Sequence, residues 1–141
     1  MKQPVFLAML SFALLGISAN CPAGKWAAEV IENLDQARIV LFLTDEDMAA
    51  MPEWRPDGHE PPPLTLAKAI DLVNAEIEKD VDLRGAEIHE LEFKPVRKHE
   101  KQHRWYFLCE VRTHDGGKEK KHFLAVLTSG KVIRAIEEPT L

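Results

Sequence analysis

Long hydrophobic runs are scarce in this chain of 141 residues, and the one that stands out covers residues 5–17 (VFLAMLSFALLGI). A helix that crosses a bilayer needs roughly 20 apolar residues, so this run is too short for a permanent anchor. It follows Lys2 and ends in small residues up to Ala19, the three-part pattern of a secretory signal peptide. We therefore expect residues 1–19 to be cleaved, leaving a periplasmic or secreted protein that begins near Asn20.

Cysteine is nearly absent, with only Cys21 and Cys109, which excludes a disulfide-rich scaffold. In an oxidising compartment the two could form one disulfide. A cysteine just after an export signal can also be the acylated first residue of a bacterial lipoprotein, although the preceding SAN matches that pattern poorly. Three states of Cys21 stay open: lipidated, paired with Cys109, or free.

An excess of positive charge is also lacking, because the formal net charge is −5. Nucleic-acid binding usually requires a basic domain, so we expect no nucleic-acid partner. Residues 25–92 hold 17 acidic and 6 basic side chains, whereas residues 93–141 hold 6 acidic and 11 basic ones. Such halves can orient a protein partner, and the alternative is ordinary solvated surface.

Motifs for catalysis are missing or badly placed. There is no glycine-rich phosphate loop and no Gly-x-Ser-x-Gly elbow, and Ser129 falls in a predicted turn. Cys109 stands among apolar residues, which disfavour a reactive thiolate. We expect a protein that is not an enzyme, without catalytic residues or cofactors.

Residues 99–103 (HEKQH) match the zinc-protease pattern His-Glu-x-x-His, which works when both histidines share one face of a helix. Pro95 lies just before, the flanking residues offer no apolar face, and strand-like alternation follows. We expect a solvated connection and no metal site. A zinc-dependent hydrolase using His99, Glu100 and His103 is the remaining alternative.

The clearest element is a helix over residues 64–80 (LTLAKAIDLVNAEIEKD). Its apolar residues recur at the spacing of one helical face. Thr65 is placed to cap the first turn, and the prolines at 61–63 prevent extension backwards. The expected buried face consists of Leu66, Ala69, Ile70, Val73 and Ile77.

Alternating patterns dominate from residue 86 onward and predict strands at residues 86–96, 103–113, 121–128 and 132–137, with hairpin turns at 115–117 and 129–130. In the second strand Phe107 and Cys109 share one face and Tyr106 and Leu108 the other. We expect a helix to cover one face only and the opposite face to be wetter.

The N-terminal part is less regular. Residues 36–44 (QARIVLFLT) predict a first strand, residues 25–34 a short helix leading to it, and residues 45–63, with five prolines, a connection. Residues 20–63 and 64–141 together have the size of one domain.

The expected fold class is therefore α+β, with one helix packed on a four- to five-stranded antiparallel sheet in the order β-α-β-β-β-β. This order resembles the cystatin-like fold. Residues 64–137 also contain LTLAKA at 64–69, WYFLCEV at 105–111, DGGK at 115–118 and LTSGKV at 127–132. With these segments, this part of the chain resembles the PepSY domain, a family of small exported modules. The resemblance implies peptidase inhibition or envelope regulation and supplies no catalytic residues.

Basic side chains gather near two strand connections, which a meander would place at opposite ends of the sheet. The candidate partner-binding residues are Lys98, Lys101, Arg104, Lys118, Lys120 and Lys121. Trp26 and Trp54 flank the first strand, where tryptophans usually pack as lids on a core. We expect a non-enzymatic binding module that contacts a protein or peptide partner in the cell envelope through a sheet edge or hairpin tips. The alternative is a peptidase inhibitor or propeptide-like regulator.

Overall fold

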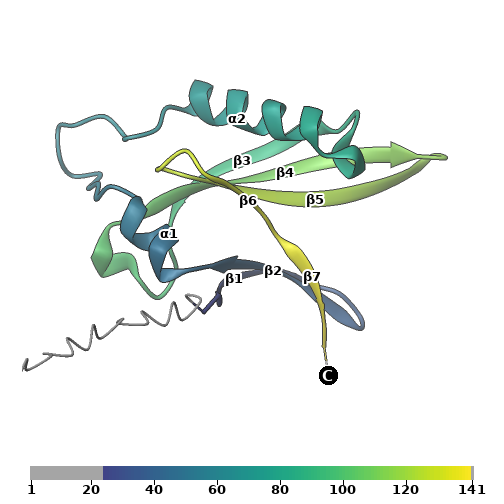
Figure 1. Ribbon diagram of the computed structural model, residues 1–141, viewed down its shortest axis with the longest axis horizontal. Coiled ribbons are helices and arrows are strands. Elements are labelled where there is room, and N and C mark those ends of the chain that lie inside the picture. Colours follow the sequence, from purple (N-terminus) through teal and green to yellow (C-terminus); the bar gives the residue numbers. More distant parts are fainter. Residues whose placement is uncertain (1–23, 141) are drawn as a thin grey trace, which may run out of the picture.

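The computed structural model describes residues 24–140, so the expected signal peptide and Cys21 lie outside the described residues. Figure 1 shows three layers: α2 covers one face of a four-stranded sheet, and a three-stranded sheet lies on the other side. The elements in chain order are β1 (Trp26–Asn33), β2 (Ala37–Leu43), α1 (Asp45–Ala50), α2 (Leu66–Lys79), η1 (Val81–Leu83), β3 (Glu87–Pro95), η2 (Glu100–Gln102), β4 (Trp105–Asp115), β5 (Lys118–Leu127), β6 (Val132–Arg134) and β7 (Ile136–Pro139).

The expected single sheet is in fact two antiparallel sheets, ordered β3-β4-β5-β6 and β1-β2-β7. The α+β class and the main helix are confirmed. The strand predicted at residues 36–44 exists as β2, but it pairs with β1 and β7 and belongs to the smaller sheet.

The helix predicted at residues 25–34 is wrong, because this segment forms β1. Its pairing with β2 has two register shifts, one between Ala27 and Glu29 and one between Val30 and Glu32. Each shift interrupts the two-residue alternation, so the sequence of β1 does not show the pattern of a regular strand. Residues 45–63, predicted as a connection, contain the short helix α1, capped by Thr44 and Asp47 in a capping box.

Helix α2 begins and ends close to the prediction. The Thr65 hydroxyl accepts a hydrogen bond from the backbone N–H of Lys68 at 3.2 Å, as expected of an N-cap. Ala69, Val73 and Ile77 are buried against the sheet. The prediction that Leu66 is buried is wrong, since it is 54% exposed, and Leu64 before the helix is buried in this core instead.

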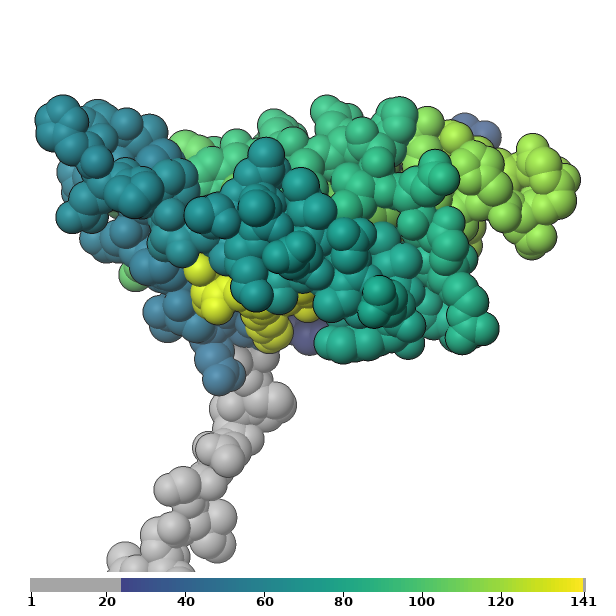
Figure 2. Space-filling view, turned by 90° about the horizontal axis from the view of Figure 1, so that it is seen from above, coloured from purple at the N-terminus to yellow at the C-terminus, as the bar shows by residue number. Residues whose placement is uncertain are grey.

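Both faces of the four-stranded sheet are covered, so the prediction of one wetter face is wrong. Phe107 and Cys109 pack under α2, whereas Tyr106 and Leu108 are buried against the smaller sheet. The face of β4 that points away from α2 carries apolar side chains because a second sheet, which the sequence pattern did not predict, lies over it. Seen from above in Figure 2, α2 crosses the sheet and the tip of the β4–β5 hairpin projects beyond the helix at one end.

The contact between the two sheets includes buried polar groups. The carboxylate of Glu29 accepts hydrogen bonds from the Tyr106 hydroxyl and from Lys94 Nζ, the latter at 2.7 Å. Burial and the adjacent Glu29 carboxylate raise the pKa of Tyr106 above its ordinary value. Glu29 is thus paired, as a buried carboxylate must be to offset its loss of hydration.

Candidate functional site

The strand predicted at residues 132–137 is split between the two sheets. Its first part, β6, pairs with β5, and its second part, β7, pairs with β2. The chain changes sheets at Ala135, whose N–H donates to the carbonyl of Phe123 at 2.9 Å. Because the neighbouring strand leaves at this point, no strand of residues 24–140 lies beside β5 from Lys118 to His122 on that side.

The groups exposed on this edge follow from the alternation of an antiparallel strand. The Phe123 carbonyl points toward Ala135, so the backbone groups of Lys121 and Glu119, two and four residues earlier, point to the same side. Those of Lys120 and His122 point toward β4 instead. The free edge therefore presents N–H and C=O groups of two residues in the geometry of a sheet ladder.

The other sheet edges are interrupted or short. The β1 edge has two register shifts, the β3 edge has one between Ile88 and Glu90, β6 has only three residues, and β7 has four and ends at Pro139. By contrast, β4 and β5 pair in continuous register over all of β5. Bulges and prolines are the common means of blocking an edge, so the edge of β5 is the one best formed to accept another strand.

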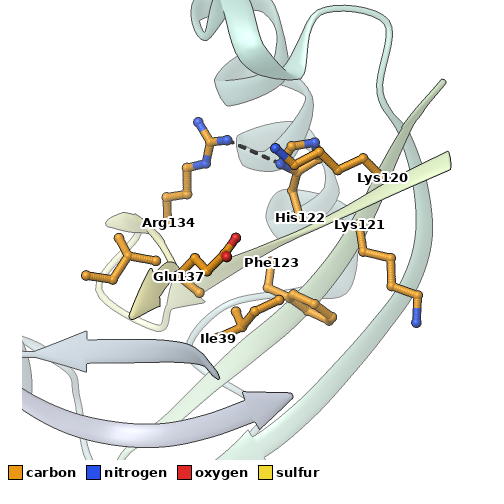
Figure 3. Close-up of a pocket in the computed structure, with 9 residues that line it drawn as sticks. Ile39, Lys120, Lys121, His122, Phe123, Arg134 and Glu137 are labelled. Atoms are coloured by element: carbon orange, nitrogen blue, oxygen red, sulfur yellow. Dashed lines mark hydrogen bonds between the residues drawn. The ribbon is translucent and has the colours of Figure 1, made fainter. Parts of the chain in front are cut away.

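A cleft of about 320 Å³ lies beside this edge, between β5 and the chain that crosses to the smaller sheet. Figure 3 shows that its side chains come from both sheets. The residues that line this cleft include Ile39, Lys120, His122, Phe123, Arg134 and Glu137.

On the side of the cleft toward α2, His122 and Arg134 are held in a network. Arg134 Nη1 donates to Asp80 Oδ2 at 2.6 Å, and Arg134 Nη2 lies 3.2 Å from His122 Nδ1. A guanidinium only donates, so Nδ1 must accept, and the ring proton is on Nε2, 3.0 Å from Thr113 Oγ1. This arrangement fits the neutral imidazole.

Burial is the main cause that lowers the pKa of His122, and the positive charges of Arg134 and Lys120 add to it, while Asp80 and Asp82 oppose it. The side chain of Lys120 has no hydrogen-bond or ion-pair partner among residues 24–140. This side of the cleft therefore carries positive charge that the described part of the chain neutralises only at Arg134.

The opposite side of the cleft is mixed. Phe123 and Ile39 contribute to the core between the sheets, and Glu137, which is paired with Ile39 across β2 and β7, adds a carboxylate to the same face. An extended segment placed along the β5 edge would meet basic groups on one of its faces, and hydrocarbon beside one carboxylate on the other.

The six basic residues predicted as a binding site do not come together. Lys118, Lys120 and Lys121 lie on β5, and Lys98, Lys101 and Arg104 lie on the connection from β3 to β4. These two groups are at opposite ends of β4, as the meander predicted.

Arg104 also serves the fold directly. Its Nη1 donates to the Met51 carbonyl at 2.5 Å, which ties the β3–β4 connection to the segment after α1. Lys98 lines a second cleft of about 660 Å³ along β1, together with Arg38 and Arg97. In this second cleft Arg38 forms an ion pair with Glu138, and Arg97 lies 3.6 Å from Glu29. The two arginines therefore already have acidic partners.

The His-Glu-x-x-His match does not lie on an α-helix. Residues Glu100–Gln102 form a single 3₁₀ turn, and His103 has a left-handed backbone with φ 52°. His99 Nδ1 is 3.1 Å from Gln102 Nε2, and Glu100 accepts from the backbone N–H of Lys98. In the described range, no three or more His, Cys, Asp or Glu side chains are arranged to hold a metal ion.

The cysteine and the two tryptophans mentioned above are packed into the fold. Burial, with a smaller effect of Glu110, raises the pKa of Cys109 to about 12, so its thiol stays protonated at neutral pH. The ring centroids of Trp26 and His99 are 4.7 Å apart, and the indole N–H of Trp26 donates a hydrogen bond to Asp45. The ring centroids of Trp54 and Trp105 are 5.3 Å apart.

The sequence prediction missed His122, Arg134 and Glu137 as parts of one site. The signal that could have found the crossing is the run from Val132 to Ile136, in which apolar residues stand in adjacent pairs on either side of Arg134. Strict alternation would have separated them, and its loss is typical of a strand that changes the surface it packs on.

Comparison with known proteins finds no matching family model, no similar curated protein and no similar solved structure. Within residues 24–140 there is no helix that has both the length and the apolar character needed to cross a membrane.

Proposed function

We propose that this chain is an exported, non-enzymatic binding module that adds an extended segment of an envelope protein to the free edge of β5. The observation that carries the proposal is the departure of the neighbouring strand at Ala135, which leaves Lys118 to His122 without a partner strand on that side in the described part of the chain. Backbone hydrogen bonds supply the affinity in this mode of recognition, and side-chain pockets supply the specificity.

The proposed export depends on the signal-peptide pattern of residues 1–19, and cell fractionation with N-terminal sequencing tests it. A mature N-terminus near Asn20 is expected. For residues 64–137 we also propose a PepSY-like unit with cystatin-like topology. Its support is that this range comprises α2 and the complete four-stranded sheet. The resemblance to that family implies peptidase inhibition or envelope regulation, which agrees with a binding role.

The test uses a proline at the outward-facing position of the edge. Lys121→Pro removes an N–H that points away from β4, so it should block strand addition and leave the β4–β5 ladder intact. Lys121→Ala is the matched control, since it removes the same charge and keeps the N–H.

Peptides selected for binding to the protein from a random linear library are the probe. Their affinity should fall about tenfold in Lys121→Pro, the effect of losing one or two backbone hydrogen bonds, and much less in Lys121→Ala. Selected peptides that bind both variants equally well would contradict strand addition at this edge.

A further inference from the structure

The side chains around the β5 edge carry an inference about the partner, which rests on the proposed strand addition. A strand paired with Glu119 and Lys121 must direct alternate side chains to the two faces of the sheet. Directly opposed residues of neighbouring strands share a face. The side chains of β5 on each face therefore indicate what the incoming strand would contact.

Toward α2, the β5 edge presents Lys120 and His122, with Arg134 at the end where β6 departs. Figure 3 shows the nitrogen atoms of these three side chains gathered on one side of the cleft. The carboxylates of Asp80 and Asp82 lie 2.6 and 3.6 Å from Arg134 Nη1 and compensate the charge of its guanidinium. Lys120 is left as the uncompensated charge of this group in the described range, so a carboxylate beside it would be favoured.

Toward the smaller sheet, the same edge presents Lys121 and Phe123, and across the cleft lie Ile39 and Glu137. Lys121 and Glu137 are exposed, whereas Phe123 is buried and Ile39 half-buried. Apolar side chains of the incoming strand on this face would cover Ile39 and Phe123 and extend the core between the sheets.

We propose that the segment bound at the β5 edge alternates acidic and branched apolar residues, with its carboxylates toward Lys120 and Arg134 and its apolar side chains toward Ile39 and Phe123. The lysines on the edge then have two effects. They discourage pairing between copies of this chain, because two such edges repel each other, and they favour an acidic strand.

The experiment compares two synthetic peptides, Thr-Val-Asp-Val-Asp-Val-Thr and Thr-Val-Asn-Val-Asn-Val-Thr, blocked at both ends and titrated into the full chain at low ionic strength. The peptides differ only in charge, since aspartate and asparagine have nearly the same shape. The acidic peptide should bind about tenfold more tightly, and the difference should shrink as salt is added.

A charge variant locates the effect. Arg134→Gln would also break the contact with Asp80, so Lys120→Gln, at an exposed side chain without partners in the described range, is the variant of choice. It should weaken the acidic peptide about threefold and leave the neutral one unchanged. Lys68→Gln on α2, with the same loss of charge at another exposed position, is the matched control and should change neither.

The outcomes separate this inference from the proposed function. If both peptides bind equally and both lose affinity in Lys121→Pro, strand addition is retained and the acidic pattern is wrong. If neither peptide binds, or if Lys120→Gln and Lys68→Gln have the same effect, the inference is also overturned. Binding to phosphatidylglycerol vesicles that does not change in Lys121→Pro, with no peptide binding, would show a membrane surface instead and overturn both proposals.

Discussion

The two faces of the four-stranded sheet are closed in different ways. Under α2 the interface is apolar, formed by one regular helix over Phe107, Cys109 and Leu124. The face toward β1, β2 and β7 combines an apolar core with two buried carboxylates, Glu29 paired with the half-buried Lys94 and Asp47 paired with the exposed Lys131, and it opens into a cleft at one end. A regular helix can cover a sheet along its length, whereas two sheets joined by a crossing strand leave a gap where that strand departs.

The largest expected effect is on the helix face. Leu124 is fully buried there, so Leu124→Ala should lower the free energy of unfolding by about 2–5 kcal/mol, through lost apolar burial and a remaining cavity. Urea denaturation followed by circular dichroism measures it. Leu66→Ala is the control, because Leu66 is 54% exposed and should cost far less. Equal losses in the two variants would mean that α2 does not lie on the sheet in this register.

On the other face, Tyr106→Phe removes the hydroxyl that donates to the buried Glu29 carboxylate and should cost about 1–3 kcal/mol. Because Tyr106 is the only tyrosine in the chain, its ionisation can be followed by ultraviolet absorbance. Its pKa is raised above 10.0, so the folded protein should show no phenolate as pH passes through 10.

The raised pKa of Tyr106 also makes the stability of the folded protein depend on pH. The contribution of Tyr106 is fully present below pH 10 and is lost as pH rises above it, because the unfolded chain then releases a proton that the folded chain retains. Titration of the native protein with an ordinary midpoint would show that the Tyr106 hydroxyl is not held between the sheets.

The free edge predicts a contrast between two neighbouring positions. Lys120→Pro removes an N–H directed at β4 and should destabilise the protein by about 1–2 kcal/mol more than Lys121→Pro, whose N–H points outward. Thermal unfolding of the two variants, each compared with its alanine counterpart, checks this order. The reverse order would show that the outward side of β5 has been assigned wrongly.

The smallest effect concerns His122 in the cleft. Its pKa is lowered from 6.5, first by burial and then by Arg134 and Lys120, so the folded state favours the neutral ring. This contribution to stability is present above pH 6.5 and is lost as pH falls below that value, because the unfolded chain takes up the proton first. Unfolding midpoints of the native protein and of His122→Gln, measured from pH 7.5 to 5.5, should converge as the pH falls. Parallel curves would contradict a neutral His122 bonded to Arg134.

Several elements could be predicted from local pattern. The period of residues 64–80 and the capping position of Thr65 located α2, and alternation with glycine turns located β3, β4 and β5. The six basic residues were found by composition, and the meander correctly separated them into two groups. What the sequence did not reveal is that His122 and Arg134 meet, because they lie on different strands and their contact depends on where β6 ends.

The sequence by itself determined the α+β class, the main helix and the strands that pair through tight turns, since these depend on the spacing of apolar residues and on turns between neighbouring segments. The tertiary structure alone decided that β1 and β2 form a second layer, that the last strand crosses between sheets at Ala135, and that β5 keeps an edge free of other described strands beside a cleft lined by His122 and Arg134. Those features come from pairing between segments far apart in the chain, such as β2 with β7. Local periodicity does not encode which distant strand will be the neighbour.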